Sequence, residues 1–365
     1  MRKIGLEDLR NIAVGASVLG AGGGGDPYIG RLMASQAIEE YGPVTLLDPL
    51  EVPDDALIIP SAMMGSPTVL VEKIPNGKEI IGAFRALEKH LGKKAYATMA
   101  AEEGGINSMV PLMVAATLGI PIVDCDGMGR AFPEIQMVTM TIGGISATPM
   151  SIADEKGNIL LLETIDNLWT EKFSRSITVD MGGSAMIALY PMSGAQLKKW
   201  TVHGSVSQAE KIGLAIRSAR KQKRNPIEAV LKEVRGFILF KGKIVDVYRR
   251  VVKGFARGRT IIDGFDEFEG KRLTIEFQNE NLVAIDEVRG VIASVPDLIC
   301  ILEMETGEPI TTEGLKYGYR VYVLGLPCPE LWRTPEGLKL VGPKYFGYNV
   351  EYKPIEKIYG GELEK

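Results

Sequence analysis

Between residues 56 and 126, short apolar runs alternate with segments of helical length, and this alternation limits the possible folds of the chain more than any other feature. It predicts three strands with two helices between them: strands at 56–67, 94–100 and 120–126, helices at 78–91 and 107–118. Strand, helix, strand, helix, strand at this spacing predicts a parallel sheet with right-handed crossovers. Open sheets of this kind bind ligands at the carboxyl ends of their strands, so the residues after these runs are the first candidates for a site.

The chain has 365 residues, more than one ordinary hydrophobic core accommodates, so two domains are expected. The predicted fold class is α/β. Residues 1–170 are expected to form a three-layer domain with a largely parallel sheet, and residues 171–365 a strand-rich α+β domain. A basic helix at 204–225 opens the second domain, and alternating runs typical of strands follow it. Two of these runs meet at "FKGK", where Gly242 predicts the turn of a hairpin.

Five of the six residues from Gly20 to Gly25 are glycines, and an Asp-Pro pair follows them. A helical pattern covers residues 6–19, while Asp26 and Pro27 have the form of an N-cap and a first helical residue. The stretch is therefore a joint between two helices. That separates it from a P-loop or a dinucleotide-binding fingerprint, because both of these follow a strand.

Two interpretations of this joint remain open. It is either a tight connection, or a ligand-binding wall in which main-chain N–H groups of Gly23, Gly24 and Gly25 and the helix N-terminus at Asp26 bind an anionic or carbonyl-bearing ligand. The substitution Gly24→Val separates them. A folded protein without turnover supports the binding wall, and loss of folding supports the tight connection.

Acidic residues gather in loops that the predicted topology brings to one edge of the sheet: Asp26, Glu102, Glu103, Asp124, Asp126 and Glu134. Converging carboxylates can bind a hard cation, create a general acid or base by shifting one another's pKa, or accept hydrogen bonds from an N–H-rich ligand. Each can equally be a turn or cap residue. The catalytic candidates among them are Glu102, Glu103, Asp124 and Asp126, and the pair Asp124 and Asp126 is the candidate metal site.

The small number of histidines limits the kinds of metal site that this chain can form. The chain contains His90 and His203 alone, so a three-histidine site within one chain is impossible, and a divalent ion such as zinc would depend on carboxylates. His203, just before the basic helix, is a catalytic candidate as proton shuttle or nitrogen ligand, with a surface or capping role as the alternative. Cys125 alternates with Asp124 and Asp126, so we expect it to face the other way and pack in the core.

Two further polar residues are candidate substrate ligands. Arg130, in "DCDGMGRAFPE", can clamp a carboxylate or a pair of carbonyls, or neutralise a nearby aspartate. Asn279 interrupts an apolar strand pattern together with Glu280 and Asn281. A turn tip explains this interruption, and an amide beside a carboxylate also suits a cyclic ureide or a metal.

The net charge of −4 conceals a basic region, since residues 198–259 carry 17 Lys or Arg against 4 Asp or Glu. Such a region attracts nucleic acid or an anionic partner. No nucleic-acid motif accompanies it, so we expect no nucleic-acid partner. We expect instead that this region is a helix and strands that face an acidic domain or subunit. The protein is expected to be a homo-oligomer. No apolar run is long enough to span a membrane, and the N-terminus lacks the apolar segment of a signal peptide, so a cytoplasmic protein without membrane contact is expected.

Several long motifs together resemble one family. They are "GAGGGGDP", "AAEEGGIN", "DCDGMGRAFPE", "FQNENLVA" and the segment from "VPDLICILEMETGEP" to "GPKYFGYNVEY", in this order and across almost the full length. The sequence is similar to the family long catalogued as domain of unknown function 917, now named for S-methyl thiohydantoin desulfurase, with an N-terminal and a C-terminal domain. The resemblance implies that the motif positions matter: Gly22 to Asp26, Glu102, Glu103, Asn107, Asp124, Asp126 and Arg130.

The resemblance also implies a reaction class, because the activity that names the family hydrolyses a sulfur substituent from a five-membered, ureide-like ring. We therefore expect a hydrolase of a hydantoin-like or S-substituted thiohydantoin ring, acting in a cleft between the domains. Its water would be activated by a carboxylate or a divalent metal, with no nucleotide cofactor. The alternatives are a non-catalytic partner of a hydantoinase or oxoprolinase complex, since members are often encoded near such subunits, and a regulatory module that binds a small anion.

Overall fold

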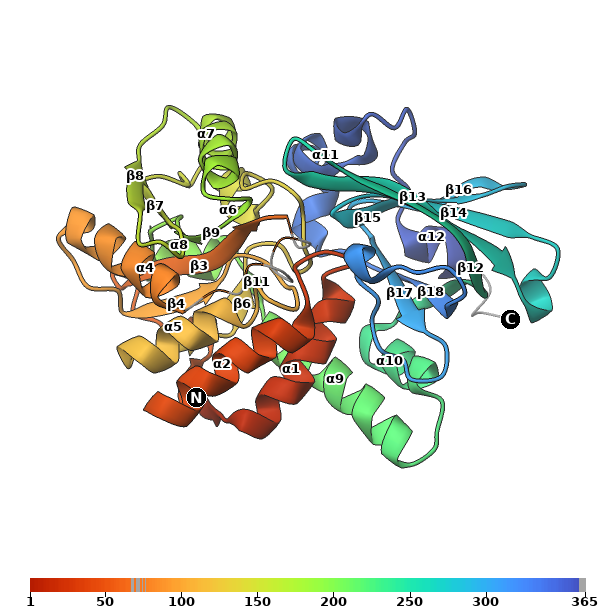
Figure 1. Ribbon diagram of the computed structural model, residues 1–365, viewed down its shortest axis with the longest axis horizontal. Helices are drawn as coiled ribbons and strands as arrows, with labels where there is room; N and C mark the ends of the chain where they lie inside the picture. The colour runs from red at the N-terminus through yellow and green to blue at the C-terminus, as the bar shows by residue number, and fades with distance from the viewer. Residues whose placement is uncertain (67–68, 70–72, 74, 76, 361–365) are drawn as a thin grey trace.

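The computed structural model describes residues 1–66, 69, 73, 75 and 77–360 of the chain. Two large sheets organise the molecule, seen at the left and right of Figure 1. The elements up to residue 203 are β1 (Arg2–Ile4), α1 (Leu6–Leu19), α2 (Pro27–Tyr41), β2 (Val44–Leu47), β3 (Leu57–Gly65), α4 (Lys78–Leu91), β4 (Ala97–Ala100), α5 (Val110–Leu118), β5 (Ile122–Val123), β6 (Cys125–Asp126), α6 (Thr139–Ile142), β7 (Met150–Ala153), β8 (Ile159–Leu162), α7 (Asn167–Asp180), β9 (Ser184–Ala188), β10 (Met192–Ser193), α8 (Gly194–Trp200) and β11 (Val202–His203).

The remaining elements begin with two helices, continue through seven strands, and end with two short helices. They are α9 (Ser205–Lys221), α10 (Pro226–Val234), β12 (Phe237–Val252), β13 (Phe255–Gly264), β14 (Arg272–Gln278), β15 (Glu280–Asp286), β16 (Gly290–Ser294), β17 (Leu298–Glu303), β18 (Arg320–Leu326), α11 (Pro335–Val341) and α12 (Ile355–Tyr359).

The first sheet has the strand order β1-β2-β5-β4-β3-β9-β7-β8, with β10 beside β3. Its central pairs β2–β5, β5–β4 and β4–β3 are parallel, and antiparallel strands extend it on both sides. Helices lie on both sides of the sheet in Figure 1. The α/β prediction is confirmed, with a mixed sheet whose centre is parallel.

The predicted alternation of strands and helices is confirmed, because β3, α4, β4, α5 and β5 follow one another in this order. Some bounds differ. The strand predicted at 56–67 ends at Gly65, and residue 67 lies outside the described residues. The helix predicted from residue 107 begins at Val110, after a series of turns. The strand predicted at 120–126 divides at Asp124, and its second part, β6, pairs with β11 in a separate small sheet.

The second sheet is antiparallel and curled, with the order β16-β15-β14-β13-β12-β18-β17. The hairpin predicted at "FKGK" is wrong, because β12 runs straight through Gly242 for 16 residues. The chain turns later, at Lys253 and Gly254, whose φ angles are +51° and +81°. A Cβ at residue 242 would lie 2.1 Å from the main-chain oxygen of Asp263. Glycine at this position therefore allows β12 and β13 to lie close together, and it does not form a turn.

The basic helix predicted at 204–225 ends at Lys221, and α10 follows it, with the Asn225 side chain accepting a hydrogen bond from the N–H of Ile227 at 2.9 Å. One long basic helix was predicted in the second half, which also contains the shorter helix α10 and, among others, α7, α8, α11 and α12. Helix α9 packs on α1, and they touch where a Cβ at Gly15 would lie 1.7 Å from the main-chain oxygen of Ala209. The first sheet includes β9 and β10, beyond residue 170, where the domain boundary was predicted. That boundary stays a prediction.

Within the described residues, no helix is both long and apolar enough to cross a membrane.

Candidate functional site

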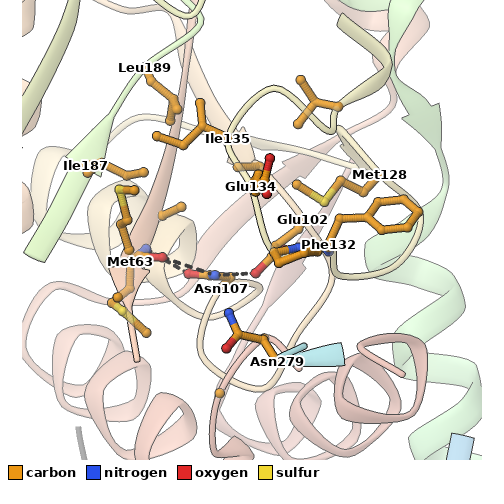
Figure 2. Close-up of a pocket in the computed structure, with 18 of the residues that line it drawn as sticks. Met63, Glu102, Asn107, Met128, Phe132, Glu134, Ile135, Ile187, Leu189 and Asn279 are labelled. Carbon is orange, nitrogen blue, oxygen red and sulfur yellow. Dashed lines mark hydrogen bonds between the residues drawn. The ribbon is translucent and has the colours of Figure 1, made fainter. Parts of the chain in front are cut away.

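A cavity lies where the carboxyl ends of β3 and β4 meet the turn between β14 and β15 (Figure 2). The centres of water-sized molecules can occupy about 70 Å³ of it, and it opens to solvent. Its polar lining comes from Glu102, Asn107, Glu134, Arg175, Asn279 and Glu280, and its apolar wall includes Met63, Met64, Phe132, Ile135, Ile187 and Leu189. The cavity therefore occupies the sheet edge at which a ligand site is expected in this topology.

Glu102 lies two residues beyond β4, and Asn107 holds it in place. The Asn107 amide donates one hydrogen bond to Glu102 Oε1 at 2.5 Å and another to the main-chain oxygen of Met63 at 3.3 Å, while its own oxygen accepts from Met63 N at 2.7 Å. The N–H of Phe132 donates to Glu102 Oε2 at 3.2 Å. Burial raises the pKa of Glu102 to about 7, although these hydrogen bonds and the charge of Arg130 lower it. A carboxyl group with this pKa can exchange a proton at neutral pH.

The turn between β14 and β15 brings two residues of the second sheet to the same cavity. Asn279 has φ +58°, so the expected turn tip is confirmed. Its side-chain oxygen accepts from Ala256 N at 2.8 Å, its N–H donates to Ala256 O at 2.8 Å, and its carbonyl accepts from Thr312 Oγ1 at 2.6 Å. Glu280 follows it and is 2% exposed. Burial, and then the charge of Glu102, raise the pKa of Glu280 well above its usual range.

The glycine joint passes between this turn and the loop after β4. Asp26 caps α2, since its carboxylate accepts from Tyr28 N at 2.7 Å and Ile29 N at 3.2 Å, as predicted. On one side, Ala21 O accepts from Asn281 N at 2.9 Å.

On the other side of the joint, Gly24 O accepts from Ile106 N at 2.8 Å. A Cβ at Gly23 would lie 2.0 Å from Glu280 Oε1, and one at Gly24 would lie 2.4 Å from the Cα of Gly104. The glycines therefore allow two segments to pack against the joint, which supports the tight connection. Gly24 and Gly25 also line the cavity, so ligand contact at these two positions stays a prediction.

Arg130 is fully buried and lies outside the cavity lining. Its guanidinium donates to the main-chain oxygens of Ala131 at 2.9 Å, Pro296 at 2.8 Å and Asp297 at 2.9 Å. It also stacks on Phe132, with 4.4 Å from Cζ to the ring centroid. Arg130 thus connects the loop after β6 to the loop before β17, and its charge faces the cavity carboxyls from behind.

Asp124 and His203 do not line the cavity. The Asp124 carboxylate accepts from Ser207 N at 3.0 Å and from the Ser207 hydroxyl, so it caps α9. His203 pairs with Cys125 between β11 and β6 and is exposed. Cys125 is fully buried, as expected, and burial raises its pKa well above the usual value.

Glu103 and Asp126 are fully buried behind the cavity. Ser108 Oγ donates to Glu103 Oε2 at 2.7 Å, and burial raises the pKa of Glu103 to about 7. Asp126 accepts from the N–H groups of Met128 at 2.8 Å and Gly129 at 2.7 Å, while burial and the charge of Glu103 raise its pKa well above the usual range. The predicted acidic cluster thus separates: Glu102 and Glu134 line the cavity, whereas Glu103 and Asp126 do not, and the predicted catalytic roles stay predictions.

The two carboxylates of the candidate metal pair accept hydrogen bonds from different main-chain N–H groups, Asp124 from Ser207 and Asp126 from Met128 and Gly129. In the part of the chain that the structure describes, no three His, Cys, Asp or Glu side chains are grouped so that they could hold a metal. A divalent ion therefore stays a prediction.

Four polar residues of the cavity are not among the predicted site residues: Glu134, Arg175, Tyr190 and Glu280. The sequence shows Glu134 and Glu280 as polar positions, but no local pattern connects Glu280 with Glu102. Arg175, on α7, pairs with Glu171 at 2.8 Å. Tyr190 is fully buried, with its hydroxyl donating to Ile135 O at 3.1 Å, and burial raises its pKa. A tyrosine with φ +50° has no local signal that would reveal it.

Comparison with known proteins gives a consistent result. The family model for the N-terminal domain of S-Me-THD-like proteins matches residues 7–164, and that for the C-terminal domain matches residues 165–355. A crystal structure of a protein from Chromobacterium violaceum is similar to 97% of this chain and 100% of that chain, with a TM-score of 0.79 and 25% identity. No curated protein matches the chain significantly.

Proposed function

The chain belongs to the S-Me-THD-like family, and we propose that it is a hydrolase of an S-substituted thiohydantoin or related hydantoin-like ring, with Glu102 as the general base. The proposal rests on one observation, the position and environment of Glu102. Glu102 is buried at the end of a parallel strand, inside the cavity, with both oxygens oriented by hydrogen bonds and a pKa of about 7. The alternative of a regulatory module is kept as an outcome of the test below.

The proposed reaction replaces sulfur by oxygen on the ring. Glu102 takes a proton from water, and the water oxygen bonds to the ring carbon that carries the sulfur. The carbon–sulfur bond breaks with its electron pair on sulfur, which takes up one proton and leaves as a thiol. The apolar wall of the cavity, with Phe132, Ile187 and Leu189, fits a ring that carries an aliphatic substituent. None of these steps passes through a metal, and elemental analysis of the purified protein checks whether a divalent ion is bound.

The test uses an S-methyl thiohydantoin with an isobutyl substituent and measures thiol release. Glu102→Gln keeps the shape of the side chain but cannot accept a proton, so kcat should fall by about 100-fold or more. For the wild type, kcat should rise with pH through about 7, because Glu102 acts when deprotonated. Glu39→Gln, an exposed residue of α2, is the matched control and should keep full activity.

An unchanged rate in Glu102→Gln would exclude Glu102 as the base. If the wild type binds the ring, seen as ligand-dependent thermal stabilisation, but releases no thiol, the regulatory module becomes the better description.

A second candidate function has one observation in its favour. Arg250 and Arg257 lie directly opposite each other on β12 and β13, next to the pair of Tyr248 and Arg259, around a hollow on the exposed hairpin. Like charges in direct cross-strand contact repel, so an anionic partner surface would stabilise them. This suits a partner subunit of the hydantoinase or oxoprolinase type. Salt-sensitive co-purification of such a subunit, lost in Arg250→Ala with Arg257→Ala, would support it.

A further inference from the structure

Glu280 is the most unusual group in the cavity that the proposed mechanism has not used. It comes from the second sheet, while Glu102 and Asn107 come from the first. Its Oε2 is buried and, within the described residues, has no hydrogen-bond partner. Its Oε1 lies against the backbone of Gly23, so closely that a side chain on residue 23 would collide with it. A buried polar atom without a partner costs free energy, and such a cost calls for a physical reason at this position.

The groups that face Glu280 determine whether it carries a proton. Burial is the largest influence, the charges of Glu102 and Glu313 act in the same direction, and the charge of Arg130 opposes them. Together they raise the pKa of Glu280 well above its usual range. This favours the protonated form of Glu280, whose pKa also responds to the charge of Glu102, the carboxyl group with a pKa of about 7.

Asn279 directs a second donor to the same place. Its side-chain oxygen is held by the N–H of Ala256 at 2.8 Å, which fixes the orientation of the amide. Figure 2 shows the amide nitrogen pointing toward Asn107 across the cavity. This nitrogen makes no hydrogen bond to any residue that the structure describes. The turn thus presents two donors, one at Asn279 and one at Glu280.

We propose that the Asn279–Glu280 turn supplies the acid half of the reaction, with Glu280 donating a proton to the departing sulfur and the Asn279 amide holding an oxygen or nitrogen acceptor of the ring. This inference rests on the proposed function of Glu102. In this arrangement both sheets contribute catalytic residues to the active site, because the base follows a strand of the first sheet and the acid lies on the second.

The proton balance closes within the site. Water loses one proton to Glu102 and forms the new carbon–oxygen bond. The carbon–sulfur bond breaks, its electron pair stays on sulfur, and the Glu280 proton completes the thiol. Glu102 then returns the proton it took, restoring Glu280 through water or the product, so the net change is one water consumed and one thiol released.

The activity test is again thiol release from the isobutyl-substituted S-methyl thiohydantoin. Glu280→Gln replaces a neutral acid by a neutral amide of the same shape, so the protein should fold, and kcat should fall about 100-fold with KM little changed. Asn279→Asp keeps the acceptor for Ala256 and tolerates a positive φ, but loses the donor, and should lower kcat by at least about 100-fold. Glu287→Gln, exposed just beyond β15, is the matched control and should match the wild type.

A second measurement does not require activity. Infrared difference spectra of wild type minus Glu280→Gln at pH 7 should contain the carbonyl band of a protonated carboxylic acid, absent from wild type minus Glu287→Gln. If this band is present and no thiol is ever released, the proposed reaction is wrong while the proton on Glu280 stands. If the band is absent, or if Glu280→Gln keeps the wild-type kcat, the role of Glu280 is overturned.

Discussion

At the scale of single residues, two separate features of the structure require a glycine at position 24: its backbone conformation and the close approach of another segment. Its φ is +73°, a conformation that side chains with a Cβ rarely adopt, and any Cβ would lie 2.4 Å from the Cα of Gly104. Neither requirement depends on a ligand. The sequence shows the run of glycines and the helix cap that follows, but the partner segment that presses on them is 80 residues away along the chain.

Gly24→Val should therefore destabilise the fold by roughly 2–5 kcal/mol, through backbone strain and overpacking together. Chemical denaturation measures this loss. Gly92→Val is the matched control, because Gly92 has φ +65° with no atom within 4 Å of its added Cβ, and strain alone should cost about 1–2 kcal/mol. Equal losses in the two variants would show that Gly104 does not constrain Gly24, and a stable but inactive Gly24→Val would restore the ligand-binding wall.

At the scale of elements, β12 shows how a local signal can mislead. Gly242 in "FKGK" resembles a hairpin turn, yet it pairs with Gly264 on one side and Val321 on the other, in the middle of a 16-residue strand. By contrast, β3, α4, β4, α5 and β5 were predictable, because short apolar runs of strand length alternate there with segments of helix length.

Gly242→Val tests the close approach of the strands. Valine favours strands, so local propensity alone predicts a gain in stability. Its Cβ would instead lie 2.1 Å from Asp263 O, so we expect a loss of about 1–3 kcal/mol in the free energy of unfolding. Lys243→Val, one residue further along β12, is the control and should change the stability by less than about 1 kcal/mol. A stabilised Gly242→Val would mean that the strands separate at little cost.

At the scale of the whole molecule, Arg130 connects the two sheets at the back of the cavity. It donates to main-chain oxygens of Pro296 and Asp297, and its charge lowers the pKa of Glu102 and Glu280. Sequence reasoning proposed it as a ligand clamp or a neutralising charge. Its buried hydrogen bonds indicate that it chiefly holds the second sheet against the first.

Arg130→Met should lower the free energy of unfolding by about 3–5 kcal/mol, because it leaves buried carbonyls without donors. The measurement is a denaturant titration followed by both tryptophan fluorescence and circular dichroism. Arg10→Met removes an exposed cation from α1 and should cost less than about 1 kcal/mol. A small loss for Arg130→Met would show that other contacts hold the sheets together.

The sequence alone determined the features that depend on nearby residues. The helix start at Asp26, the parallel strands β3 to β5, and the polar residues after β4 follow from caps and periodicity that act over a few positions. Only the tertiary structure decided that Asp124 caps α9 and lies away from the cavity, and that Asn279 and Glu280 meet Glu102. These contacts form because the second sheet shares a buried apolar core with the first half of the chain, as where β17 packs on α1, and that packing joins residues that no local pattern connects.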